Sequence, residues 1–208
     1  MLFATAALVG VATVGAWASP MTVSSGRLAA VSLPVTITSD SFTADADAYT
    51  QQASPTTNAS TGTTMDVASA VSANKRSFVH FDLTTIPTDA RVQSATLQLR
   101  MSAAPAASRT YEVDKTNATW DGSTITWSNM PTTAAATATV ASGTSSGVNL
   151  TWDVTTDVAL FVAGSVTNNG WQVKDSAESS TTATTASFRT SEFSSAGQRP
   201  TLSVVYVT

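Results

Sequence analysis

The segment ATLQLRM at residues 95–101 alternates apolar and polar side chains with a strict period of two. Because successive side chains of a β-strand point to opposite faces of the sheet, this pattern predicts a strand with one packed face and one solvated face. The same alternation recurs at 148–154 and at 202–206, and from Ser41 onward short periodic runs are separated by clusters of turn residues. Such spacing is typical of sandwiches and jelly rolls. The sequence therefore predicts an all-β fold, an antiparallel β-sandwich or jelly roll.

One short helix is predicted within this β fold. Val158, Phe161 and Val162 recur at helical spacing. The polar residues at 155–157 can cap its N-terminus, and Gly164 can end it. We expect the helix to close one end of the sandwich.

Composition excludes several classes of protein. The 208 residues are few enough for a single domain, and 42% of them are hydrophobic whereas only 12% are charged, which favours strands and polar turns. The net charge of -4 would repel a phosphate backbone, so nucleic acid is not an expected partner. Because the chain has no cysteine, it has neither disulfides nor thiolate zinc sites.

The N-terminal residues have the features of a signal peptide. Residues 1–18 contain an apolar run that ends in Ala-Trp-Ala, the small-x-small pattern of a cleavage site, although no Lys or Arg precedes the run. A membrane-tethered segment and a buried helix are the alternatives. Residues 19–40 are expected to form a linker or an edge strand, and residues 41–208 the domain. No second apolar stretch could span a membrane after cleavage, so we expect a secreted protein, extracellular or at the cell surface.

Several blocks of residues occur in an order shared with a known family. They are DADAYTQQASPTTNAS at 45–60, NKRSFVHFDLTTIPTDARVQSATLQLRM at 74–101, ATWDGSTITWSNMP at 118–131, WDVTTDVALFVAG at 152–164, NNGWQVKDS at 168–176, and a close formed by 186–193 and 198–207. With these blocks the chain resembles the DNRLRE-type domain, a secreted β-sandwich family that includes carbohydrate-binding modules. The resemblance implies a non-catalytic module that binds a polysaccharide or a cell-envelope glycan.

Two classes of function remain open. The first is the polysaccharide-binding module, acting as a monomer. The second is a structural or adhesive cell-surface protein that recognises protein or envelope components. Some members of such families are similar to alginate-binding modules, and a protein that binds an anionic polysaccharide should carry many Lys and Arg residues on its binding face. This acidic chain has ten in total, which argues against alginate as the ligand.

The candidate ligand-binding residues are aromatic side chains and cations. A sugar stacks its apolar face on an aromatic ring while neighbouring polar groups bind its hydroxyls. Trp120 stands beside an Asp-Gly turn and is therefore the preferred stacking residue, with Tyr49 as a second candidate. Lys75, Arg76 and Arg100 are the expected polar partners, and they share a face if their strands lie near each other.

The other side chains that could carry chemistry are expected to have structural roles. Trp152 and Trp171 share the parity of core aliphatic residues, so we expect them to pack in the interior. His80, the only histidine, lies within a strand rather than on a loop beside a carboxylate, and no catalytic residue is expected. Arg189 and Glu192 are expected to form an ion pair or to brace a loop.

Asp45 and Asp47 are the candidate metal ligands. They are separated by one residue, so an extended strand would point both carboxylates the same way. This spacing is compatible with a structural calcium site built from oxygen ligands. The alternative is that both are turn or edge carboxylates with no ion.

Overall fold

The computed structural model describes residues 35–208, which contain eleven strands, one α-helix and one short 3-10 helix. The strands are β1 (Ile37–Thr43), β2 (Ala46–Gln51), β3 (Thr64–Ser69), β4 (Lys75–His80), β5 (Arg91–Ala103), β6 (Thr110–Thr116), β7 (Thr133–Ala141), β8 (Val148–Asp153), β9 (Trp171–Asp175), β10 (Thr184–Arg189) and β11 (Thr201–Val207). The helices are α1 (Thr155–Val162) and η1 (Ala196–Gln198). The predicted signal peptide, residues 1–18, lies outside the described residues.

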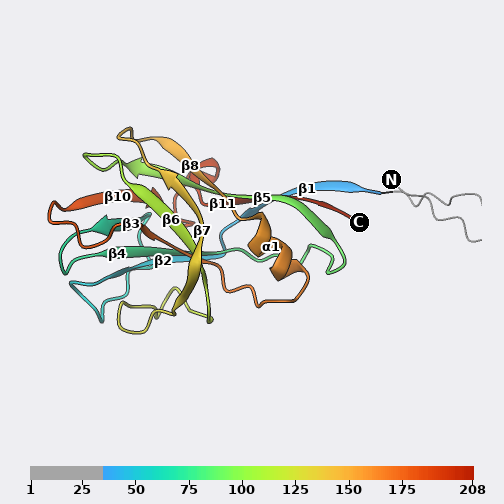
Figure 1. Ribbon diagram of the computed structural model, residues 1–208, viewed down its shortest axis with the longest axis horizontal. Coiled ribbons are helices and arrows are strands. Elements are labelled where there is room, and N and C mark those ends of the chain that lie inside the picture. Colours follow the sequence, from blue (N-terminus) through green and yellow to red (C-terminus); the bar gives the residue numbers. More distant parts are fainter. Residues whose placement is uncertain (1–34) are drawn as a thin grey trace, which may run out of the picture. The chain divides into compact units, whose positions relative to one another are not determined.

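The strands of the described chain join one antiparallel sheet that curls around its own core (Figure 1). The order is β1-β11-β5-β10-β3-β4-β9-β6-β7, with β8 beside β5 and β2 beside β4. The backbone register between β3 and β4 contains a single residue pair, Ala68 with Lys75. Across the core, the indole Nε1 of Trp152 on β8 donates a hydrogen bond to the carbonyl of Tyr111 on β6 (3.1 Å). The predicted antiparallel sandwich or jelly roll with one short helix is confirmed.

Buried apolar residues alternate with partly buried polar residues in β5, as the sequence predicts. Ala95, Leu97, Leu99 and Met101 are all at most 1% exposed, whereas the polar residues between them are only partly buried. They pack in the main core together with Trp152 and Trp171, so the prediction that these two indoles are interior packing residues is confirmed. Each fully buried Leu or Met side chain contributes about 1.5–3 kcal/mol to the stability of the fold. The main core therefore holds the sandwich together.

Strand β4 sends side chains to two different apolar clusters. Val79 belongs to the main core, whereas Phe78 points to the opposite face and packs with Ala48 and Ile125. Trp120 also packs on this second cluster, and it lies in the segment between β6 and β7. The outer face of β2 and β4 is therefore covered by this β6–β7 segment instead of facing water.

Helix α1 is present, but its N-terminus differs from the sequence expectation. The helix begins at Thr155, and its N-cap is Val154, with no side-chain capping bond, so residues 155–157 do not cap it. Asp157 instead turns inward and accepts a hydrogen bond from the indole of Trp171 (2.9 Å). The side chain of Asp157 therefore bonds to a buried residue of another element instead of capping the helix, as its local sequence position would suggest. At the other end, Gly164 adopts a φ of +65°, as expected of a residue that ends a helix.

The two ends of the described chain lie side by side. Strand β1 pairs with β11, and Thr36 and Thr208 exchange two backbone hydrogen bonds of 3.1 Å each (Figure 1). Residues 37–40, which fall in the range expected to be a linker or an edge strand, form the first half of β1. Within the described residues, neither helix is long and apolar enough to cross a membrane.

Candidate functional site

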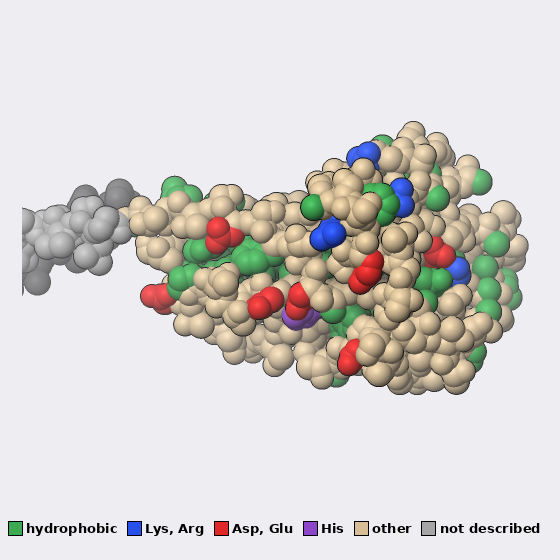
Figure 2. Space-filling view, turned by 180° about the vertical axis from the view of Figure 1, so that it is seen from behind, with side chains coloured by type: hydrophobic (Ala, Val, Ile, Leu, Met, Phe, Trp, Pro, Cys, Tyr) green, Lys and Arg blue, Asp and Glu red, His purple; other side chains and the backbone are tan. Residues whose placement is uncertain are grey.

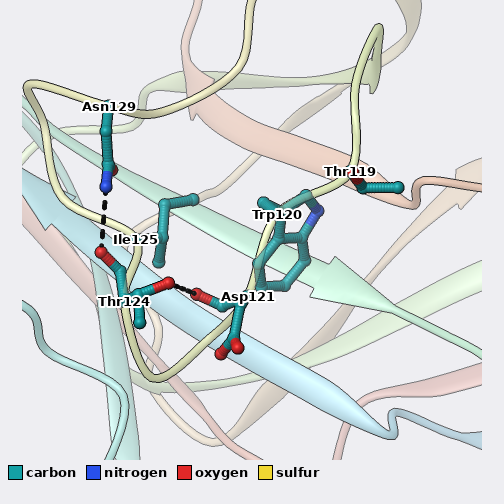
Figure 3. A pocket seen from close by; sticks show the side chains of 6 residues that line it. All are labelled: Thr119, Trp120, Asp121, Thr124, Ile125 and Asn129. Carbon is teal, nitrogen blue, oxygen red and sulfur yellow. Dashed lines mark hydrogen bonds between the residues drawn. The ribbon is translucent and has the colours of Figure 1, made fainter.

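A groove lies where the β6–β7 segment meets the start of β2 and the end of β4. We call it the Trp120 groove, and it is lined by Asp45, Ala46, His80, Thr119, Trp120, Asp121, Gly122, Asn168 and Asn169. A second pocket, shown in Figure 3, shares Thr119, Trp120 and Asp121 with it and adds Thr124, Ile125 and Asn129. Because both pockets include Trp120, this residue forms a wall that the two pockets have in common.

The indole of Trp120 is held in a fixed orientation. Its Nε1 donates a hydrogen bond to the carbonyl of Asn169 (2.8 Å), and its ring packs on Phe78 with the centroids 5.6 Å apart. The side chain is therefore half-buried rather than free, and the part that remains accessible faces both pockets. An aromatic ring held in one orientation loses little conformational entropy when a ligand stacks on it.

The turn after Trp120 is stabilised by its own side chains. Asp121 Oδ1 accepts hydrogen bonds from the backbone N–H and the hydroxyl of Ser123, both at 2.7 Å, which confirms the turn role expected for this Asp-Gly pair. The same bonds lower the pKa of Asp121 below its usual value, so the exposed carboxylate is charged at neutral pH. Figure 3 shows two further bonds in the turn, from Thr124 to the carbonyl of Asp121 and from Asn129 to the carbonyl of Thr124.

The far wall of the groove comes from the Asn-Asn-Gly turn before β9. Asn168 donates a hydrogen bond to the carbonyl of Phe81 (2.8 Å), which anchors the turn on the residue that follows β4. Gly170 has a φ of +72°, and a Cβ there would stand 2.2 Å from the carbonyl oxygen of Val79. Sequence reasoning did not assign these asparagines to a site, although an Asn-Gly pair is a recognisable turn signal.

The groove is acidic. Asp45 Oδ1 lies 2.7 Å from His80 Nδ1, and Asp121 is on the same rim. His80 and Asn168 also line a more apolar neighbouring pocket, which includes Asp82. Figure 2 shows the imidazole among carboxylates on this face of the molecule. Among the described residues, no Lys or Arg lines any of these pockets.

The predicted ligand-binding residues Lys75 and Arg76 have partners away from the groove. Lys75 forms a 2.7 Å salt bridge with Asp66 and lies over the ring of Tyr49, 5.2 Å from its centroid. Arg76 binds both carboxylate oxygens of Glu178, at 2.8 and 2.6 Å, and stacks on Trp127. These cations are already neutralised within the fold.

Arg100 lies on a different part of the sheet. It projects from β5 and donates a hydrogen bond to Asn149 on β8 (3.3 Å). Since β10 and β3 stand between β5 and β4 in the sheet, the shared face expected for Lys75, Arg76 and Arg100 does not form. Of the predicted ligand-binding residues, only Trp120 lies in the groove; a role for Tyr49 and the three cations in ligand binding stays a prediction.

The candidate metal ligands Asp45 and Asp47 have separate partners. Asp45 contacts His80, whereas Asp47 is buried and its Oδ2 accepts a hydrogen bond from the backbone N–H of Ser191 (2.7 Å). Burial raises the pKa of Asp47 to about 6. In the described part of the chain, no three His, Asp or Glu side chains form a cluster that could hold a metal. The calcium site expected from these two residues stays a prediction.

The expected ion pair between Arg189 and Glu192 is wrong. The guanidinium of Arg189 stacks on the ring of Phe193, 3.8 Å from its centroid, and thereby braces the loop after β10. Glu192 turns instead toward a pocket that it shares with Asp47. The sequence has no local signal for this arrangement, because Asp47 and its donor Ser191 are 144 residues apart.

The fold and the groove define a β-sandwich that presents one ordered aromatic ring among polar side chains, which is the arrangement of a carbohydrate-binding module. The model of carbohydrate-binding module family 96 matches residues 38–206, so the chain belongs to this family. The match confirms the carbohydrate-binding part of the resemblance noted in the sequence, and it does not extend to the DNRLRE-type label. No curated protein sequence matches the chain.

Proposed function

We propose that this protein is a non-catalytic extracellular module that binds a polysaccharide in the Trp120 groove. The observation that carries the proposal is the indole of Trp120, which is fixed by Asn169 and Phe78 yet still lines two open pockets. Asp121, Asn168 and the backbone around them supply hydrogen-bonding groups for sugar hydroxyls at its edges. The extracellular location is supported by the signal peptide predicted at residues 1–18.

The charge of the groove favours sugars without carboxylates. Asp45 and Asp121 line the groove, Asp82 stands beside it, and hydrogen bonds from Thr84 lower the pKa of Asp82. A uronic acid would meet these negative charges, and no Lys or Arg among residues 35–208 lines the groove to offset them. Neutral or amino sugars are therefore the proposed ligands, in agreement with the low number of cations in the chain.

A binding role fits the surroundings of His80 better than a catalytic one. The imidazole contacts Asp45, a pairing that would orient a catalytic base. Nucleophilic catalysis would also need a hydroxyl bonded to the imidazole, and within residues 35–208 Asp45 is the side chain with which it forms a hydrogen bond. The pair instead braces the start of β2 against the end of β4.

Affinity electrophoresis tests the proposed function. The full chain would be run through gels that contain neutral, amino-sugar or uronic-acid polysaccharides, with a non-binding protein of similar size as the reference. We expect retardation by at least one neutral or amino-sugar polymer and none by alginate. Lack of retardation across the whole panel, together with concentration-dependent self-association, would contradict the proposal and favour the structural or adhesive alternative.

A further inference from the structure

A further pocket, which shares Asp45, Ala46, Asp121 and Gly122 with the Trp120 groove, contains a buried carboxylate without a full set of partners. The side chain belongs to Asp47, which is 4% exposed and lies on β2. Its Oδ2 accepts the backbone N–H of Ser191, whereas its Oδ1 is buried and has no hydrogen-bond partner among residues 35–208. An ionised oxygen buried without a donor is strongly unfavourable, so this atom requires an explanation.

Glu192 brings a second carboxylate to the same place. It follows Ser191 directly, and the hydroxyl of Ser191 donates to Glu192 Oε1 (3.1 Å). The pocket that both carboxylates line has a volume of about 400 Å³, and its other walls are Asp45, Ala46, Ser60, Thr61, Asp121, Gly122 and Ser123. These residues offer hydroxyl, carboxylate and carbonyl oxygens. No Lys or Arg of the described chain lines the pocket.

Two neighbouring carboxylates without a counter-charge repel each other. Either a shared proton or a shared cation can relieve the repulsion. A cation leaves both carboxylates ionised and also gives Asp47 Oδ1 the partner that it lacks.

We propose that Asp47 and Glu192 bind one calcium ion that fastens the start of β2 to the loop after β10. Calcium accepts six to eight oxygen ligands in irregular arrangements, so carbonyl and hydroxyl oxygens of the pocket and water complete the set around two carboxylates. Magnesium requires near-octahedral geometry and gives up water reluctantly, which makes it the poorer fit. Glu192 thus takes the role that the sequence suggested for Asp45, because Asp45 is directed to His80.

The ion would connect segments that are far apart in the sequence. Asp47 on β2 and Ser191 in the loop after β10 are separated by 144 residues and are joined by one backbone-to-carboxylate hydrogen bond. An ion that binds only the folded state stabilises it in proportion to its concentration. This inference does not depend on the proposed function, since the ion would stabilise the module whether or not a glycan occupies the groove.

Calcium titration of the full chain at pH 7.5 tests the site. After dialysis against EDTA, isothermal titration with calcium chloride should give one binding event per chain. Calcium at about one hundred times its dissociation constant should raise the Tm by roughly 5–10 °C. Magnesium at the same concentration and ionic strength should raise the Tm much less. Equal effects of the two ions, or no heat of binding, would overturn the proposal.

Three variants separate ion binding from general effects of charge and folding. Asp47→Asn and Glu192→Gln should each weaken calcium binding at least tenfold, while in EDTA both should melt at or above the temperature of the unaltered protein because the repulsion is removed. Asp89→Asn removes an exposed carboxylate outside the pocket and should leave calcium binding unchanged. If Asp47→Asn and Glu192→Gln bind calcium as the unaltered protein does, the assignment is wrong.

Discussion

The indole Nε1 of Trp171 donates a hydrogen bond to Asp157 Oδ2 (2.9 Å) in the interior of the sandwich. The same carboxylate accepts hydrogen bonds from Thr137 on β7 (2.6 Å) and from Lys115 on β6 (3.2 Å). One side chain of α1 therefore holds three strands, β6, β7 and β9, together. The helix is therefore attached to the sandwich through polar contacts as well as through its apolar residues.

Replacing this carboxylate should destabilise the fold. Asp157→Ala leaves the Trp171 N–H and the Lys115 ammonium without their partner, and breaking buried charge-assisted bonds of this kind costs about 3 kcal/mol. Urea denaturation followed by tryptophan fluorescence measures the loss. Asp153→Ala offers a comparison, because that carboxylate is exposed and bonds only to Thr155, so its loss should cost under about 1 kcal/mol. Equal losses in the two variants would contradict the bracing role of Asp157.

Removing the ring of Trp120 should abolish glycan binding without unfolding the protein. Trp120→Ala deletes the wall shared by the two pockets, and we expect at least a tenfold weaker affinity for any polysaccharide that the unaltered chain binds. Trp127→Ala is the matched control, because Trp127 lies on the same segment but stacks on Arg76 outside the groove. Affinity electrophoresis of both variants, with circular dichroism to verify folding, provides the measurement. Binding that depends on Trp127 and not on Trp120 would place the ligand elsewhere.

Asp114 should make the stability of the protein depend on pH. Burial raises its pKa to about 6, and the charge of Glu112 adds to the rise, whereas Lys174, Thr133 and Arg76 oppose it. The folded state therefore holds a proton between roughly pH 4 and pH 6 that the unfolded state has lost, so this group's contribution to stability declines as the pH rises through that range.

Asp114→Asn removes this titrating group and provides the test of its effect. The variant should gain about 1–3 kcal/mol over the unaltered protein at pH 7.5 and much less at pH 4. Because both proteins share every other titrating group, the difference between their free energies of unfolding isolates Asp114. A difference that does not change between pH 4 and pH 7.5 would refute the raised pKa.

Gly170 should be the least replaceable glycine of the groove. An added Cβ would clash with the carbonyl of Val79 at 2.2 Å, and φ is +72°, so we expect Gly170→Ala to lower stability by about 3 kcal/mol or more. Gly164 has a similar φ of +65° but no atom within 4 Å, so Gly164→Ala should cost only about 1 kcal/mol. Thermal melts of the two variants compare steric clash with conformational strain. If both variants lose the same amount of stability, the close approach of the Asn-Asn-Gly turn to β4 does not determine the cost of replacing Gly170.

Local pattern predicted much of this fold. The period of two in β5 and β8 identified residues that are buried, including Trp152, because burial of one strand face follows directly from parity. In the site, the Asp-Gly turn placed Trp120 on a surface segment. The sequence did not indicate that this segment folds back over Phe78, since that contact joins elements that are not neighbours in the chain.

Long-range electrostatic partners account for what the sequence did not predict. Arg76 pairs with Glu178, 102 residues later, and no spacing rule reveals such a contact. The sequence therefore suggests Lys75 and Arg76 as ligand-binding groups, whereas the fold neutralises them with Asp66 and Glu178. The N-cap of α1 was misplaced for the same reason, because Asp157 gains more from buried partners on three strands than from capping a helix.

The paired ends of β1 and β11 have a mechanical consequence. Because Thr36 and Thr208 are direct hydrogen-bonded partners, a force that pulls them apart acts perpendicular to the strands and opens the β1–β11 ladder one rung at a time, beginning at that pair. Such a force never acts on all seven residue pairs at the same time, so the module should unfold at low force when it is pulled at Thr36 and Thr208.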